Sequence, residues 1–295
     1  MSILLAFACA VVYGVADYCG GRASRTAAST MVALAGQATS LVVGVIVVAV
    51  MGTSVPGWHD WLWGGVAGVA SAVALIAFYH ALSHGAMTVV APITAVTSAA
   101  LPVAYGLISG ERPSALAYAG MAVAVVAVAL VSGAVGTRHT HTGRLTIGLA
   151  FLAGLGFAVI FVALGRTSSS SGMWSLVASR MVSVVLVGGS VLATFIRTSD
   201  RRGSAPLAPP RPPPGWAVWR LAALAGALDM SANVLYLLAV RRGLLSIVVV
   251  VAALYPVSTV CLAFGLDRER VSKSQALGMG LAIGALVLVS LGSSG

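Results

Sequence analysis

Charged side chains are scarce in this sequence. Only 8% of its residues are Asp, Glu, Lys or Arg, whereas 59% are hydrophobic and the mean hydropathy is +1.01. A soluble domain carries roughly a quarter charged residues, so this chain has too few of them to cover a surface in water. Most of its apolar side chains must therefore face lipid or one another, as they do in an integral membrane protein.

Cysteine is equally rare. Cys9, Cys19 and Cys261 lie in apolar stretches, and their spacing suits neither a metal site nor a disulfide framework. The sequence also has no glycine-rich phosphate loop of the Walker type. We therefore expect no metal, no cofactor and no use of ATP.

The net charge of +10 raises the question of a nucleic-acid partner. The basic residues are spread over the connections between apolar stretches, however, and form no single patch. This distribution favours loops at an anionic membrane surface, and we expect no nucleic-acid partner.

Ten apolar stretches are long enough to cross a bilayer as helices, since a crossing needs about 20 residues. They cover residues 2–21, 30–52, 61–83, 86–108, 114–135, 144–166, 172–197, 216–240, 244–266 and 272–292. One connection is long, the segment 198–215, and its proline content predicts an extended linker in solvent. Most basic residues follow odd-numbered spans, which places this linker in the cytoplasm and both termini outside. We predict a multi-pass protein of the cytoplasmic membrane.

The sequence repeats itself once. The motif Gly57-Trp58-x-x-Trp61 recurs 158 residues later as Gly215-Trp216-x-x-Trp219. Glu111-Arg112 recurs at the same offset as Glu269-Arg270. Near the N-terminus the offset is 144, and the linker accounts for the difference. We therefore expect two domains, residues 1–143 and residues 144–295 with the linker inside the second.

Each repeat holds five helices. Because five is an odd number, the second copy must enter the membrane with the opposite orientation. The predicted fold class is an all-α integral membrane protein with ten transmembrane helices in two inverted five-helix repeats. Transporters of this kind bind substrate at mid-membrane between the repeats. Here we expect a site lined mainly by spans 1, 3, 4, 6, 8 and 9.

Three motifs accompany the repeats. Tyr13-Gly14 lies in the first span, Arg180 lies in the second helix of the second repeat, and Gly85 is followed by Ala91-Pro92 and a loop with Glu111. Together with the ten spans, they resemble the EamA family of the drug/metabolite transporter superfamily over nearly the whole chain. That family often has Trp-Gly in place of Tyr13-Gly14.

The resemblance implies a secondary transporter rather than an enzyme. On this basis we expect it to export a small polar metabolite, an amino-acid-like compound or a drug by alternating access, with a proton as a candidate coupling ion. The alternatives are a membrane-embedded enzyme and a scaffold without transport activity. An enzyme would need a cluster of catalytic residues in interfacial loops, and we predict no catalytic residue. A scaffold would not need carboxylates inside its spans.

Polar side chains inside spans carry the site predictions, because they are costly in lipid. Asp229, Asn233 and Tyr236 share one face of the eighth span. They could line a cavity that binds a cation or a proton, or Asp229 could be a structural carboxyl paired with Arg180. For Arg180 we favour that pairing, or the anchoring of a helix crossing, over contact with an anionic substrate. In the first repeat, Gln37 occupies the position equivalent to Arg180.

Further candidates lie toward the ends of spans. Asp17, one turn beyond Tyr13, marks either an entrance to the substrate path or a carboxylate that reaches headgroup water. His80 could titrate near neutral pH, although a hydrated histidine at the interface is the favoured interpretation.

Proline and glycine inside the spans predict local geometry. Pro256 is one of three prolines that predict kinks. Glycines four residues apart, at Gly64/Gly68 and Gly280/Gly284, predict close helix packing.

Overall fold

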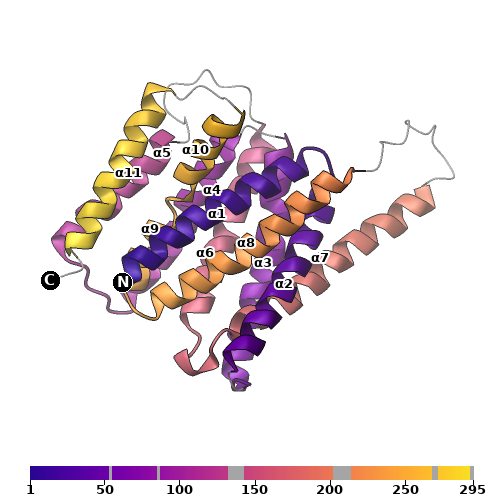
Figure 1. The fold of residues 1–295 in the computed structure, drawn as a ribbon, viewed down its shortest axis with the longest axis horizontal. Helices are drawn as coiled ribbons and strands as arrows, with labels where there is room; N and C mark the ends of the chain where they lie inside the picture. The colour runs from indigo at the N-terminus through magenta and orange to yellow at the C-terminus, as the bar shows by residue number, and fades with distance from the viewer. Residues whose placement is uncertain (53–54, 85–86, 132–142, 202–213, 268–271, 293–295) are drawn as a thin grey trace.

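The computed structural model describes residues 1–52, 55–84, 87–131, 143–201, 214–267 and 272–292 (Figure 1). Over these residues the chain forms α-helices and one short 3-10 helix, with no strand among them. The elements are α1 (Ser2–Ser24), α2 (Ser29–Met51), α3 (Trp58–His84), α4 (Met87–Ile108), α5 (Ala115–Val131), α6 (Arg144–Gly165), η1 (Ser169–Ser171), α7 (Trp174–Arg201), α8 (Trp216–Val240), α9 (Leu245–Ala252), α10 (Tyr255–Asp267) and α11 (Lys273–Gly292).

These helices account for the ten predicted spans. Eight segments of the described chain are long and apolar enough to cross a membrane. Two shorter apolar helices, Ile93–Ile108 within α4 and Ala115–Val131, supply the other two crossings. An even number of crossings leaves both ends of the chain on one side, and Figure 1 shows the N and C labels near each other. We call this end the terminus side, and the end where α7 stops and α8 starts the linker side.

The ninth predicted span, residues 244–266, is two helices rather than one. α9 stops at Ala252 and α10 starts at Tyr255, with a turn at Ala253 and Leu254 between them. Pro256 explains the break, because proline has no N–H to donate and its ring clashes with the carbonyl four residues earlier. Proline is tolerated in the first turn of a helix, which is where Pro256 lies. The expected kink is thus a break near the middle of the span.

The helix packing has the twofold symmetry that inverted repeats predict. Between the two repeats, α1 corresponds to α6, α2 to α7, α3 to α8, α4 to α9 with α10, and α5 to α11. Accordingly, α1 packs on α8 as α6 packs on α3, and α2 packs on α8 as α7 packs on α3. In the same way, α4 contacts α6 as α9 and α10 contact α1. Three contacts join a helix with its own counterpart, namely α5 with α11, α2 with α7, and α4 with α9 or α10. The main contacts are therefore unchanged when the two repeats are exchanged, and the self-paired contacts mark the axis.

Glycines allow the closest helix contacts. A Cβ on Gly64 would lie 2.7 Å from the carbonyl oxygen of Ser175, so α3 and α7 approach backbone to backbone at this point. Gly68 meets the next turn of α7 in the same way, which confirms the packing predicted for this pair. The prediction is wrong for Gly280/Gly284 of α11, where no described residue lies within 4 Å of the added carbon. α11 lies at the edge of the bundle beside α5 (Figure 1), so one of its faces has no neighbouring helix.

We expect Gly64→Ala to lower the thermal unfolding temperature of the purified protein in detergent. The methyl group must push α7 away, and overpacking of this kind costs about 1–3 kcal/mol. Gly280→Ala is the matched control, and it should keep or raise the unfolding temperature, because alanine favours a helix over glycine by about 1 kcal/mol. Equal stability of the two variants would contradict the backbone contact between α3 and α7.

Candidate functional site

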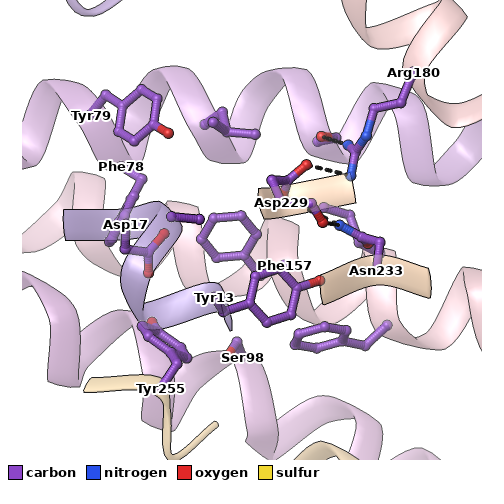
Figure 2. Close-up of a pocket in the computed structure, with 15 residues that line it drawn as sticks. Tyr13, Asp17, Phe78, Tyr79, Ser98, Phe157, Arg180, Asp229, Asn233 and Tyr255 are labelled. Carbon is purple, nitrogen blue, oxygen red and sulfur yellow. Dashed lines mark hydrogen bonds and ion pairs between the residues drawn. The ribbon is translucent and has the colours of Figure 1, made fainter. Parts of the chain in front are cut away.

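A cavity lies in the bundle between the repeats (Figure 2). It holds about 620 Å³ of empty space, including the part open to solvent, and residues of α1, α3, α4, α6, α7, α8 and α10 line it. Tyr13, Ser71 and Asp229 on its wall lie at or next to the middle of their helices. The cavity is therefore at mid-membrane. Its walls come from the spans that the sequence predicted, with α7 added.

An ion pair forms the polar end of the cavity. Arg180 Nη2 lies 2.9 Å from Asp229 Oδ2, and the two side chains are 3% and 25% exposed. The second amino group of Arg180, Nη1, donates to the Ser71 hydroxyl at 2.9 Å and to the Gln37 amide oxygen at 3.3 Å. Of the alternatives drawn from the sequence, the structure has the one in which Arg180 is paired with Asp229. The same guanidinium joins α7 to α2, α3 and α8.

Two further donors satisfy the Asp229 carboxylate. Ser40 Oγ donates to Oδ2 at 3.2 Å. Asn233 Nδ2 donates to Oδ1 at 3.2 Å and to the backbone carbonyl of Asp229 at 2.8 Å. A carboxylate away from water is costly unless it is paired and hydrogen-bonded, and these groups supply both. The amide oxygen of Asn233 is buried without a hydrogen-bond partner among the described residues.

The ion pair has an uncharged counterpart in the first repeat. Ser71 stands 158 residues before Asp229, which is the offset of the repeated motif, and Gln37 stands in the place of Arg180. Gln37 Nε2 donates to Ser71 Oγ at 3.1 Å, as Arg180 does to Asp229. Because Arg180 also contacts Gln37, two equivalent positions touch each other. The four residues thus form one hydrogen-bonded cluster on the pseudo-twofold axis.

Asp17 and Tyr13 line the cavity from α1. The Tyr13 ring meets the Phe161 ring edge-on, with 6.4 Å between their centroids. Figure 2 shows Asp17 apart from the ion pair, with Phe78 and Tyr255 on either side of it. The Asp17 carboxylate forms no hydrogen bond or ion pair with any residue that the structure describes. Asp17 thus lies on the cavity wall, and its role in a substrate path stays a prediction.

Tyr236 and His80 lie outside the cavity wall. Tyr236 is fully buried, and its hydroxyl donates to the Phe161 carbonyl at 2.8 Å, so it supports a lining residue from behind. His80 lies near the linker-side end of α3, where its ring faces that of His84 at 4.4 Å between centroids. Asn233 keeps the predicted place on the wall. The face predicted on α8 is therefore divided between the cavity and the packed interior.

Sequence reasoning missed most of the aromatic wall. Phe78, Phe157, Phe161 and Tyr255 all line the cavity. An aromatic residue within an apolar span is ordinary packing material, so the sequence did not single them out. The repeat did carry a signal, because Phe157 stands 144 residues after Tyr13 and is therefore its counterpart.

One set of hydrogen bonds joins the repeats at the terminus side. The Glu111 carboxylate accepts from the backbone N–H groups of Leu245 and Ser246, at 2.7 and 3.0 Å. These are the first two residues of α9, and the unpaired N–H groups at a helix start favour an acidic partner. The loop of Glu111 is thus a cap for a helix of the other repeat. Its counterpart, Glu269-Arg270, lies outside the described residues.

A second set of bonds lies on the same side. Asp60 accepts from both the backbone N–H and the hydroxyl of Ser168, each at 2.7 Å. Arg241 donates to the Ser168 carbonyl at 2.9 Å and to the Ser171 hydroxyl at 3.2 Å. Burial lowers the pKa of the Arg241 guanidinium from its ordinary value, and the Asp60 carboxylate opposes this shift. The start of α3 is therefore tied to the second repeat through the connection between α6 and α7.

The fold and the cavity define a class of protein, a multi-pass membrane protein of two inverted repeats with an aromatic cavity at mid-membrane that holds an ion pair. The chain belongs to the EamA-like transporter family, whose model matches residues 144–291. This match confirms the resemblance seen in the sequence. A solved structure titled "Crystal structure of protein" shares the fold, with a TM-score of 0.75 at 17% sequence identity, over 99% of this chain and 97% of that chain. No curated protein matches the sequence significantly.

The axial cluster predicts how charge removal affects stability. Arg180→Gln and Asp229→Ser should each lower the unfolding temperature in detergent, because removing one partner of a buried pair costs about 3 kcal/mol or more. The double variant reproduces the Gln37–Ser71 pair of the first repeat, so it should recover most of the lost stability. A double variant no more stable than Arg180→Gln alone would show that the pair does not act as a unit.

Proposed function

We propose that this protein is a secondary transporter that exports a small polar metabolite, an amino-acid-like compound or a drug across the cytoplasmic membrane by alternating access. The position of the cavity carries the proposal, because it lies at mid-membrane and takes its walls from both repeats. Inverted-repeat transporters bind their substrates at such a midpoint. Membership of a transporter family supports transport as the activity.

Unequal bonding at the two ends of the bundle supports alternating access. At the repeat offset of 158 residues, Val218 is the counterpart of Asp60, and Ser83 is the counterpart of Arg241. Valine has no acceptor for the bonds that Asp60 receives, and serine has neither the reach nor the charge of Arg241. The linker side therefore cannot form the bonds that Asp60 and Arg241 form at the terminus side. Opening of the terminus side would break the bonds of Asp60 and Glu111 to the other repeat.

An enzyme or a scaffold accounts less well for these features. A scaffold has no need of charged groups facing a cavity inside the membrane, where such groups are costly. An enzyme acting on lipid-linked substrates needs reactive groups at the membrane interface, whereas the charges of this cavity lie near mid-membrane. Flux into sealed vesicles separates transport from both alternatives.

A proton-linked step at Asp229 stays a prediction from the sequence. If Asp229 carries the proton, Asp229→Asn should fold and transport but lose the pH dependence of transport. If the carboxylate serves only to compensate Arg180, the same variant should insert poorly or unfold at a lower temperature. The contact of 2.9 Å between the two side chains favours the second outcome.

We expect Ala16→Phe to abolish transport by purified protein in proteoliposomes. Ala16 lines the cavity, and a phenyl ring at this position would fill part of the space that a substrate needs. Ala16→Ile should give a smaller loss, since the second repeat already carries Ile160 at the equivalent position. The measurement is uptake of compounds from a metabolite screen, each checked by counterflow.

The matched control is Val185→Phe, on a side chain of α7 that is 71% exposed on the bundle surface. It should transport at the wild-type rate. The proposal fails if Ala16→Phe, shown to be folded by gel filtration and thermal unfolding, transports as well as this control.

A further inference from the structure

The charges on the cavity wall do not balance. Three charged side chains line it, namely Arg180, Asp229 and Asp17. Arg180 and Asp229 neutralise each other at 2.9 Å. Asp17 has no such partner among the described residues, and a carboxylate without compensation is costly away from water. An ionised Asp17 therefore leaves the cavity with one negative charge to be matched.

The surroundings of Asp17 are aromatic. Six rings line the cavity, belonging to Tyr13, Phe78, Tyr79, Phe157, Phe161 and Tyr255. In Figure 2 the Asp17 carboxylate is drawn near Phe78 and Tyr255, and the Tyr13 ring lies on the side toward Asn233. The face of an aromatic ring attracts a cation, and the attraction grows where water is excluded. The rings also offer an apolar surface for the body of a ligand.

Two groups on the wall that accept hydrogen bonds but cannot donate them are left without a described partner. The Asp17 carboxylate accepts, and so does the amide oxygen of Asn233, which is buried without a partner among the described residues. Arg180 Nε is a buried donor that also lacks a described partner, but the charge of that guanidinium is already matched by Asp229. A ligand that donates hydrogen bonds and carries a positive charge would satisfy the Asp17 carboxylate and the Asn233 amide oxygen.

We propose that the cavity binds an organic cation, an amine whose ammonium group pairs with Asp17 and whose apolar or aromatic body lies among the rings. This proposal rests on the proposed function and names the substrate class of the same cavity. An anion of the same shape is repelled by the ionised Asp17 carboxylate, and a neutral analogue leaves that charge without a partner.

The test uses three probes of nearly equal shape, namely phenethylamine, phenethyl alcohol and hydrocinnamate. Binding to the purified full-length protein in detergent is measured by isothermal titration calorimetry. We expect the amine to bind roughly tenfold or more tightly than the alcohol, and the anion to bind least. Equal binding of the amine and the alcohol, or tighter binding of the anion, would overturn the proposal.

Variants locate the charge effect at Asp17. Asp17→Asn should lower the ratio of amine to alcohol affinity by roughly tenfold, because the ion pair is lost. Asp17→Glu should keep most of that ratio. Val185→Phe, the exposed control on α7, lies outside the cavity wall and should leave the ratio unchanged. Since the alcohol reports on an intact cavity, a variant that no longer folds is recognised by the loss of alcohol binding as well.

A second pair of variants tests the aromatic wall. Phe157→Leu keeps an apolar side chain but removes the ring, and it should weaken amine binding by roughly threefold or more. Phe157→Tyr keeps the ring and should bind the amine as the wild type does. If the leucine variant binds the amine as well as the tyrosine variant does, the ring does not contribute to cation binding.

The proposed substrate class and the proposed function can be contradicted independently of each other. If a zwitterion or an anion crosses the membrane, is blocked by Ala16→Phe and binds more tightly than phenethylamine, the substrate class is wrong and the proposed function stands. If phenethylamine binds through Asp17 and no compound crosses the membrane, the cation site stands and the proposed function fails.

Discussion

The contact between Arg180 and Asp229 is the interaction on which the centre of this bundle depends. Either charge alone would be costly at mid-membrane, and each has its partner at 2.9 Å. Donors and acceptors from Gln37, Ser40 and Ser71 complete the cluster. Because these groups come from α2, α3, α7 and α8, the cluster fixes how the two repeats meet. The cavity between them is defined by this junction.

The position of the cluster explains why the repeats differ there. A twofold axis brings equivalent residues into contact, and Arg180 lies against Gln37 across it at 3.3 Å. An arginine at both positions would put two guanidinium groups against each other in a medium of low dielectric, where like charges repel strongly. One charged pair and one uncharged pair, Gln37 with Ser71, avoid this repulsion. The sequence therefore departs from the repeat at the place where exact symmetry is least favourable.

The same asymmetry shapes the cavity and the ends of the bundle. The counterpart of Asp17 in the second repeat is Phe161. Phe161 also lines the cavity, so the second repeat contributes a ring to the aromatic surroundings of the Asp17 carboxylate. At the terminus side, Asp60 accepts two hydrogen bonds from Ser168, whereas Val218, which has no acceptor, stands in the position equivalent to Asp60. Two similar repeats thus have unequal bonds at their ends. A protein that alternates between two conformations needs such differences, because they set which conformation is more stable.

The sequence by itself determined the membrane class, the ten crossings, the inverted repeat and the family, because these depend on hydrophobic runs and on matches along the chain. It also placed Asp229 and Asn233 on one face of α8, since helical periodicity is a local property. Tertiary structure decided that Arg180 reaches Asp229, that Tyr236 packs behind the wall, and that Asp17 is left unpaired among aromatic rings. These outcomes depend on which helices are neighbours and how they are rotated, and an apolar span looks much the same whether it faces lipid, a partner helix or a cavity. The glycines show this most simply, because Gly64 and Gly280 have the same spacing signal and only Gly64 has a helix against it.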